Sequence, residues 1–366
     1  MELQLSLKCG IVGLPNVGKS TLFNALTSAG IEAQNFPFCT IEPNKGIVAV
    51  PDQRLNAIAE IVSPEKIIPT TTEFVDIAGL VKGASEGEGL GNKFLSHIRE
   101  TQAILHVIRC FENPDITHVH DEINPITDLE TVEMELLLAD IESLSNAIQR
   151  LEKASRSGDK EILTQIENYT ALSNELSSGI LGRNAPSFKK NPEAFKELSL
   201  ITVKPCLYVG NIEDLNNENS LLDDLIQYGK DKNSVVLPMC NQLEAEIAEL
   251  DTEEGKEFLE DMGLKEPGLN KLIRESYKML SLITYFTAGE KEVRAWTIQD
   301  GSTAPQAAGV IHTDFQKGFI RAETTSFDDF ISNNGELGAK EAGKLRSEGS
   351  EYKVKDGDIM HFRFNV

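Results

Sequence analysis

The sequence has few of the features that mark a specialised class of protein. Only five of its 366 residues are cysteine, and no two of them form a C-x-x-C pair. This low count argues against a disulfide scaffold and favours a reducing compartment. No apolar run approaches the roughly eighteen residues needed to span a bilayer, and the N-terminus lacks a basic segment followed by an apolar stretch. We therefore expect a cytoplasmic protein that makes no contact with membranes.

Positive charge is also scarce. The chain has 35 lysine and arginine residues against 58 acidic ones, which gives a net charge of −23. This balance argues against binding to naked DNA or other bare nucleic acid, because phosphate backbones attract basic surfaces. Docking on a ribonucleoprotein through a local basic patch remains compatible with it. The length and the ordinary proportion of hydrophobic residues are sufficient for two or three globular domains.

A phosphate-binding loop stands near the start of the chain. Residues 13–21 read G-L-P-N-V-G-K-S-T, lie between a strand pattern and a helix start, and match G-x-x-x-x-G-K-[ST]. Gly13 and Gly18 would let main-chain N–H groups face phosphate oxygens. Lys19 would reach the β- and γ-phosphates, and the Ser20 hydroxyl would bind Mg²⁺. The nucleotide-binding residues predicted in this loop are Asn16, Val17, Gly18, Lys19, Ser20 and Thr21.

Two later segments complete the pattern of a nucleotide-dependent switch. A strand pattern that begins at Thr72 ends in D-x-x-G, with Asp76 and Gly79 as its fixed residues. Asp76 can support Mg²⁺ through water, and the Gly79 N–H can meet the γ-phosphate. Thr40, in the loop between these motifs, is the candidate to complete the Mg²⁺ shell. In this order the three motifs indicate a switch-type nucleoside triphosphatase that requires Mg²⁺.

The motifs converge on one family. Residues 13–21, 35–44 (N-F-P-F-C-T-I-E-P-N) and 75–92 (V-D-I-A-G-L-V-K-G-A-S-E-G-E-G-L-G-N) resemble the YchF/Obg-like ATPase family. Two C-terminal stretches, 284–289 and 318–322, resemble its TGS domain, a β-grasp module found in translation-related proteins. The resemblance covers nearly the whole chain. It implies an ATP-preferring P-loop hydrolase with a helical insertion, associated with the ribosome and chiefly with its large subunit.

The expected fold class is α/β. We expect an OBG-type P-loop nucleotide-binding domain over residues 7–265, a helical coiled-coil insertion over 128–200, and a TGS domain over 281–364. The insertion shows a 4-3-4-3 apolar repeat, which is typical of a coiled-coil seam and consists of Leu137, Ile141, Leu144, Ile148 and Leu151. Such an arm is not expected to help bury the nucleotide core. It would present a surface to a partner, or serve for packing alone.

Activation of the attacking water is the least ordinary part of the sequence. Leu80 follows Gly79, where Ras-like enzymes carry the glutamine that orients the water, so hydrolysis is expected to be slow. Asn16 resembles an asparagine with which related GTPases bind K⁺ beside the phosphates, although loop hydrogen bonding is an equal alternative. His118 and His120 offer a second route if their loop folds over the site, although loop histidines are commonly solvated. The candidate catalytic residues are Lys19, Gly79 and His118.

The base-recognition motif is altered. Residues 211–214 read N-I-E-D where GTPases have N-K-x-D, so Ile212 replaces the lysine that packs beside the base. The family resemblance implies that Ile212 contacts adenine through its main chain. The family usually has glutamate at the fourth position, whereas this chain has Asp214, as a guanine reader would. ATP is therefore favoured, GTP stays open, and the predicted base-side residues are Asn211, Ile212 and Asp214.

Three functions follow from these patterns. The leading hypothesis is a slow ATPase whose nucleotide state sets the pose of the arm and the TGS domain on the ribosome. The second is a ribosome-binding adaptor in which the nucleotide is structural. The third is a GTPase of the translation-factor type. Seven basic residues make the C-terminal region a possible docking face, or simply a solvated surface of mixed charge, and they are Arg294, His312, Lys317, Arg321, Lys340, Lys344 and Arg346.

Overall fold

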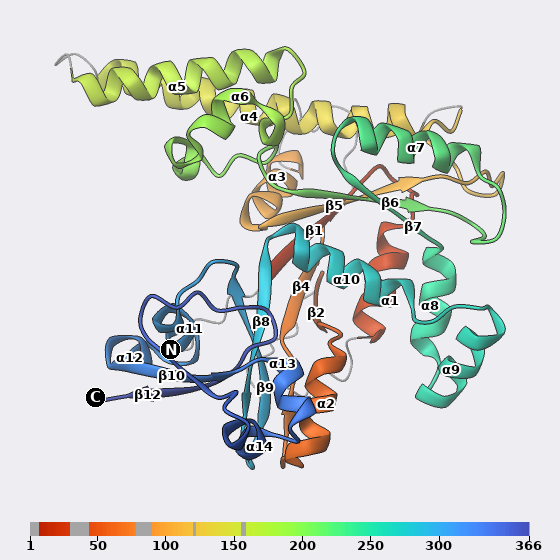
Figure 1. Ribbon diagram of the computed structural model, residues 1–366. Helices are drawn as coiled ribbons and strands as arrows, with labels where there is room; N and C mark the ends of the chain where they lie inside the picture. The colour runs from red at the N-terminus through yellow and green to blue at the C-terminus, as the bar shows by residue number, and fades with distance from the viewer. Residues whose placement is uncertain (1–6, 30–43, 78–89, 120–121, 155–158, 366) are drawn as a thin grey trace.

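The computed structural model describes residues 7–29, 44–77, 90–119, 122–154 and 159–365 (Figure 1). Two six-stranded β-sheets form the two main bodies of the molecule, and a pair of long helices extends away from the first sheet. None of the helices within these ranges is both long and apolar enough to cross a membrane.

The first sheet has the strand order β2-β4-β1-β5-β6-β7, and all its neighbours are parallel except β2 and β4. Its strands are β1 (Leu7–Val12), β2 (Lys45–Ala49), β4 (Thr71–Asp76), β5 (Ala103–Arg109), β6 (Cys206–Asn211) and β7 (Val235–Met239). Every residue of β5 is buried, as expected for a parallel strand that is covered on both faces. Ligands of such open sheets bind at the carboxyl ends of the strands.

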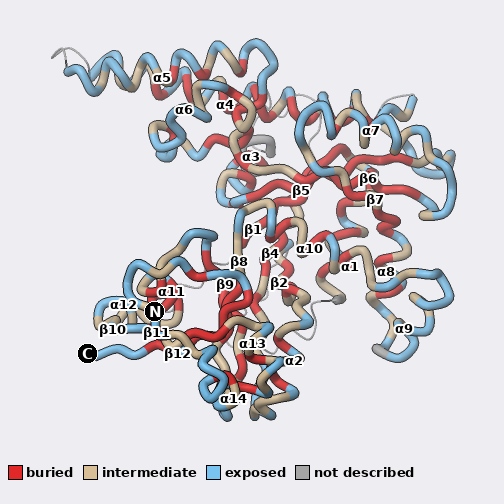
Figure 2. Tube along the Cα trace, viewed as in Figure 1, coloured by how far each residue is buried: buried red, intermediate tan, exposed pale blue. Residues whose placement is uncertain are grey.

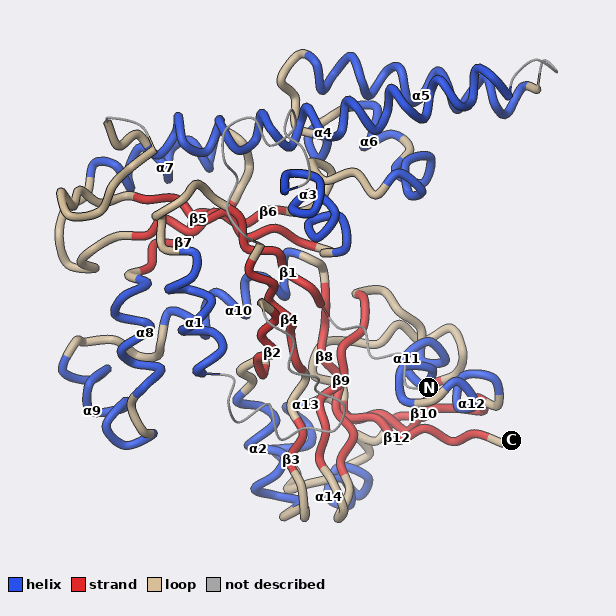
Figure 3. Tube along the Cα trace, turned by 180° about the vertical axis from the view of Figure 1, so that it is seen from behind, coloured by secondary structure: helices blue, strands red, loops and turns tan. Residues whose placement is uncertain are grey.

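Helices cover both faces of this sheet (Figures 1 and 3). On one face lie α1 (Lys19–Ala29), α8 (Asn241–Glu249) and α10 (Gly268–Met279). On the other lie α3 (Leu90–Glu100), α7 (Ser220–Asp231) and the first half of α4 (Pro125–Ala154). The helix α9 (Thr252–Asp261) connects α8 to α10. This layered arrangement is that of a doubly covered α/β domain.

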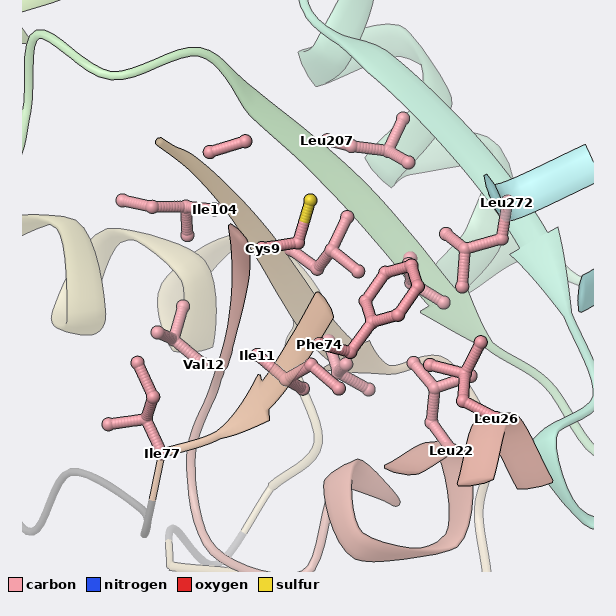
Figure 4. Close-up of a cluster of buried hydrophobic side chains, with 14 of the residues drawn as sticks. Cys9, Ile11, Val12, Leu22, Leu26, Phe74, Ile77, Ile104, Leu207 and Leu272 are labelled. Atoms are coloured by element: carbon pink, nitrogen blue, oxygen red, sulfur yellow. The ribbon is translucent and has the colours of Figure 1, made fainter. Parts of the chain in front are cut away.

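The core of the first domain lies between the sheet and these helices (Figure 4). Cys9 and Ile11 of β1, Phe74 of β4, Leu22 of α1 and Leu272 of α10 are all fully buried there. Burying each such aliphatic or aromatic side chain contributes about 1.5–3 kcal/mol. Burial also raises the pKa of the Cys9 thiol to about 12, so this cysteine is a packed core residue.

The predicted helical arm is confirmed. The helix α4 has 30 residues, which corresponds to a length of about 45 Å, and it packs along α5 (Lys160–Ser177). Leu137 and Leu144 of the predicted seam are buried against Leu172 of α5. Shorter elements return the chain to the first sheet, and they are η3 (Gly182–Asn184), α6 (Pro186–Lys190) and η4 (Pro192–Leu198).

The expectation that the arm takes no part in burying the nucleotide core is wrong for the first half of α4. Val132, Leu136 and Ala139 belong to the same buried cluster as the strands of the first sheet. With Leu129 they form a 3-4-3 stripe that precedes the coiled-coil seam. The helix therefore carries two apolar stripes in succession, one for the sheet and one for α5. Figure 2 shows the outer part of the arm largely exposed.

Buried polar groups fix the root of the arm to α3. The carboxylate of Asp140 is fully buried and accepts hydrogen bonds of 2.7–3.0 Å from the N–H groups of Ile201 and Thr202 and from the Thr202 hydroxyl. Lys204 Nζ donates to the carbonyl oxygens of Ile98, Arg99 and Thr101 at 2.5–2.8 Å. These carbonyls lie at the C-terminal end of α3, where the regular hydrogen-bond pattern of the helix stops.

The second sheet is mixed and has the order β11-β10-β12-β8-β9-β3. Its strands are β3 (Ile67–Ile68), β8 (Leu282–Ala288), β9 (Val293–Gln299), β10 (Phe319–Thr325), β11 (Arg346–Glu348) and β12 (Ile359–Phe364). The helices around it are α2 (Gln53–Val62), α11 (Ala304–Ile311), α12 (Thr313–Lys317), α13 (Phe327–Ser332) and α14 (Glu336–Glu341).

An excursion from the first sheet enters the second one. Residues 51–70 connect β2 to β4, yet β3 pairs with β9 and α2 packs on the second sheet. Leu55 and Ile58 of α2 are buried with Phe286 and Phe330. The sequence of the nucleotide domain therefore supplies one strand and one helix to the C-terminal body.

Polar contacts join the two bodies at the same place. The Tyr277 hydroxyl of α10 hydrogen-bonds with the hydroxyls of Thr284 and Thr297 at 3.1 and 3.0 Å. The guanidinium group of Arg54 forms an ion pair of 2.7 Å with Asp356. The strands and helices on either side are thus held by buried hydrogen bonds as well as by apolar packing.

Replacing Ile58 by alanine tests this packing, because Ile58 is fully buried between α2 and the second sheet. We expect a loss of about 2–4 kcal/mol of unfolding free energy in the second body. Urea unfolding followed by the fluorescence of Trp296, the single tryptophan, measures it there. Asn56→Ala, on the exposed face of the same helix, is the matched control. Equal midpoints for the two variants would contradict the packing described.

Candidate nucleotide site

The phosphate loop joins β1 to α1 and has an unusual backbone. Gly13 and Gly18 have φ values of 151° and 96°, and Asn16 has a φ of 61°. A Cβ atom at Gly13 would collide with the carbonyl oxygen of Val107, and one at Gly18 would collide with the side chain of Asn211. Glycine is therefore required at both positions for steric as well as conformational reasons. The helix α1 begins directly afterwards at Lys19, as an anion site requires.

Lys19 is buried inside the loop. The residue is 7% exposed, and its Nζ donates to the carbonyl oxygen of Leu14 at 2.5 Å. Burial lowers the pKa of Lys19 to about 8, and the nearby Asp76 carboxylate opposes that shift. An anion bound in the loop would stabilise the charged form of this lysine. The position and the chemistry fit a phosphate ligand.

Oxygen atoms suited to a divalent cation meet beside Lys19. The Ser20 hydroxyl lies 3.4 Å from Asp76 Oδ2 and donates to it. Asp76 Oδ1 is buried and has no hydrogen-bond partner among the residues that the structure describes. Burial raises the pKa of the Asp76 carboxyl. A carboxylate and a hydroxyl are the ligands that Mg²⁺ prefers, so these residues fit that ion.

Several predicted residues lie outside the described ranges. These are Thr40, Gly79, Leu80 and His120. The roles assigned to them remain predictions from the sequence.

Two asparagine side chains brace the phosphate loop from the neighbouring strands. Asn211, at the end of β6, donates through Nδ2 to the carbonyl oxygen of Val17 at 3.0 Å. Asn241 donates through Nδ2 to the carbonyl oxygen of Gly18 at 3.1 Å, and its main-chain N–H donates to Asn211 Oδ1. Asn211 thus supports the loop. Asn241 lies in the segment after β7, where the sequence predicts a base-side loop, but its contact with the phosphate loop was not predicted.

The other base-side residues are engaged with their own surroundings. The Ile212 side chain is buried, and its N–H donates to the carbonyl oxygen of Met239 at 2.9 Å. Asp214 is exposed, but its carboxylate accepts from the Asn216 N–H at 2.8 Å and from Asn217 Nδ2 at 2.9 Å. A pocket of about 790 Å³ adjoins this loop and is lined by Asp214 and Cys240. Its volume is within the range of small-molecule sites.

The loop that contains His118 folds against the phosphate loop. Asn16 Nδ2 donates to the carbonyl oxygen of Thr117 at 3.1 Å, which places this segment against the phosphate loop. The His118 side chain itself is buried, and its Nε2 lies 2.8 Å from Asp128 Oδ2. Asp128 could not be singled out from the sequence, because nothing in the spacing of the helix α4 distinguishes it from other acidic residues there.

The fold and the site define a P-loop nucleoside triphosphatase of the GTPase type. Residues 8–140 match the family MMR_HSR1, described as "50S ribosome-binding GTPase". Residues 282–365 match the family YchF-GTPase_C, described as "Protein of unknown function (DUF933)".

Full-length relatives narrow this class to one family. The chain is 58% identical to the ribosome-binding ATPase YchF of Haemophilus influenzae, over 99% of this chain and 100% of that protein. It is 51% identical to the ribosome-binding ATPase YchF of Bacillus subtilis, over the same shares. The solved structure of the Schizosaccharomyces pombe YchF GTPase is similar to it, with a TM-score of 0.88, 36% identity and 98% of each chain covered. The chain belongs to the YchF family, which confirms the predicted fold class and resemblance.

The burial of Lys19 predicts proton uptake on nucleotide binding. Near pH 8 about half of the Lys19 side chains are neutral in the free protein, and phosphate would protonate them. Titration calorimetry with ATP–Mg²⁺ in buffers of different ionisation enthalpy should show an uptake approaching about half a proton. At about pH 7 the uptake should shrink, because Lys19 is already mostly charged there.

Lys19→Arg is the matched control for this measurement. Arginine stays protonated throughout, so uptake should vanish in any variant that still binds the nucleotide. An uptake of the same size in that variant would show that another group titrates.

Proposed function

We propose that this protein binds ATP with Mg²⁺, hydrolyses it slowly, and uses its nucleotide state to control association with the ribosome. The observation that carries the proposal is the buried Lys19 of a complete phosphate loop beside the Ser20–Asp76 pair. The names of its close relatives support both the ATPase activity and the ribosome as partner. The site of action would be the cytoplasm.

Mg²⁺ would be held by Ser20 directly and by Asp76 through water. Asp76 Oδ1 supports this assignment, because it is buried without a hydrogen-bond partner among the described residues and such an atom needs a donor or a hydrated cation. Thr40 is proposed as a further ligand on its sequence position alone. The ion would neutralise charge on the β- and γ-phosphates, and Lys19 would stabilise the same charge from the protein side.

Adenine is the base that the described residues favour. The Ile212 N–H is already used by Met239, so a main-chain contact with the base would employ the Ile212 carbonyl oxygen. A carbonyl can accept from the exocyclic amino group of adenine, whereas guanine has an acceptor oxygen there. The carboxylate oxygens of Asp214, the residue that would read guanine, already accept hydrogen bonds from Asn216 and Asn217. GTP is therefore the less favoured substrate.

Slow hydrolysis is proposed from the residues around the γ-phosphate position. Gly79 would donate its N–H to that phosphate, and Leu80 cannot orient water. We propose His118 for the task of positioning water, because its loop reaches the phosphate loop at Asn16. The side-chain oxygen of Asn16 is the end that can bind K⁺, since Nδ2 donates to the carbonyl oxygen of Thr117. K⁺ is thus proposed as an additional activator.

We propose that the arm makes the contact with the ribosome, and that it binds the large subunit. The outer half of the arm is exposed along both helices (Figure 2). The basic residues of the C-terminal body are a weaker candidate, because several have acidic partners within 4 Å. These partnered residues are His312, Arg321, Lys344 and Arg346. The family description of residues 8–140 supports the large subunit.

Turnover by the Lys19→Ala variant tests the enzymatic part of the proposal. Phosphate release with ATP should fall by about a hundredfold or more, because one preorganised donor to developing charge is typically worth that much. Lys256→Ala, at an exposed position of α9, should retain wild-type turnover. In the wild type, kcat/KM should be higher for ATP than for GTP. Unchanged turnover in Lys19→Ala would refute the assignment of the hydrolytic site to the phosphate loop. A preference for GTP would refute adenine as the preferred base.

Co-sedimentation with ribosomal subunits tests the partner. Binding to the large subunit should differ between ATP, ADP and nucleotide-free conditions, because switch proteins present different surfaces in each state. Deleting the outer arm, residues 144–172, and closing the gap with a short glycine linker should abolish binding. Equal pelleting in all three conditions would favour the adaptor hypothesis, and pelleting with the small subunit alone would contradict the target.

A further inference from the structure

One loop links the phosphate site to the first turn of the arm, and its base is fixed by a buried arginine. Arg109, the last residue of β5, is fully buried. Its guanidinium group donates to the carbonyl oxygens of Phe111, Asn113 and Ile116 at 3.0–3.1 Å. Three main-chain acceptors on one rigid fork hold this part of the loop in a single shape.

The far end of the loop is held on two sides. The carbonyl oxygen of Thr117 accepts from Asn16 of the phosphate loop at 3.1 Å. The next residue, His118, turns its ring toward α4, where Nε2 meets Asp128 Oδ2 at 2.8 Å. The His118 and Asp128 side chains are only 6% and 3% exposed. The main chain at 117–118 therefore lies between the phosphate loop and α4.

Asp128 lies in the first turn of α4, and hydrogen bonds hold this turn in place. Asn124 Oδ1 accepts from the N–H groups of Ile126 and Thr127 at 3.1 and 3.0 Å, which caps the N-terminus of α4. The adjacent Leu129 is fully buried between α4 and the sheet. The charged group that faces the pair from β5 is Arg109, which interacts electrostatically with Asp128.

We propose that Asp128 is a positioning residue for nucleotide hydrolysis, acting through His118. A carboxylate bound to one ring nitrogen selects the tautomer and orientation of an imidazole, and so determines what the other nitrogen can do. Through His118 the Asp128 carboxylate would also hold Thr117 against Asn16 of the phosphate loop. The inference rests on the proposed ATPase function and deepens it, since it assigns the orientation of the site to the helix that forms the arm.

The test is the steady-state kinetics of Asp128→Asn. The variant is nearly isosteric and loses the charge, so kcat for ATP should fall about 10–100-fold while the Kd for ATP stays within about twofold. Asp128→Glu, which restores the carboxylate, should recover part of kcat. Glu142→Gln also converts a carboxylate to an amide, but at an exposed position of α4, and its kcat should match that of the wild type. Wild-type kcat in Asp128→Asn, or a weaker Kd with the same kcat, would overturn the proposal.

A double-mutant cycle with His118→Ala separates positioning from general support. If Asp128 acts through His118, Asp128→Asn should cause no further loss in the His118→Ala background. Additive losses would overturn the proposal. A wild type without ATP turnover would refute the proposed function itself, and this inference with it. ATP turnover by the wild type, with a lower kcat in the variants at positions 118 and 128, would support both the proposed function and this inference.

A spectroscopic readout applies even if Asp128→Asn folds less stably. With ¹⁵N-labelled histidine, the ring nitrogens of His118 should report a single fixed tautomer in the wild type at neutral pH. In Asp128→Asn they should report exchange between tautomers. The same fixed tautomer in both proteins would overturn the proposal.

Discussion

The nucleotide domain depends on how tightly its phosphate loop can turn. Its glycines adopt backbone angles that other residues avoid, and neighbouring atoms fill the space that their side chains would occupy. The turn is held by hydrogen bonds from Asn211 and Asn241 to the carbonyls of Val17 and Gly18. Two carbonyls that would otherwise compete for cations or water are thereby satisfied, and the N–H groups are left to face an anion. The position of Lys19 follows from this shape.

The arm is a continuation of the core rather than an attachment. One helix, α4, packs on the sheet with its first half and on α5 with its second. Asp140 and Lys204 hold its root with buried hydrogen bonds to main-chain groups. Because a buried charge without partners is costly, these contacts strongly resist displacement of the arm relative to α3. A rigid connection of this kind joins the arm to α3, the helix that follows the D-x-x-G motif.

Local patterns in the sequence predicted much of this structure. The strand and helix around the phosphate motif and the helical arm depend on spacings within one segment, and the structure contains them. The first half of α4 was misjudged because a second apolar stripe precedes the seam. Partners such as Asp128 for His118, or Asn241 for Gly18, are set by contacts between distant segments, and no spacing rule encodes them. For the same reason, the hydrogen bonds of Asp214 within its own loop could not be predicted.

The excursion of α2 and β3 bears on how the chain can be divided. A cut before β8 would separate the two sheets in sequence, yet it would strip Leu55 and Ile58 of the surfaces that cover them. It would also remove the strand beside β3 and leave an unprotected edge. The shortened protein would expose an apolar surface and would tend to aggregate. The two bodies therefore cannot be separated by one cut in the chain. A truncated or fused protein that folds must keep residues 51–70 together with the C-terminal sheet.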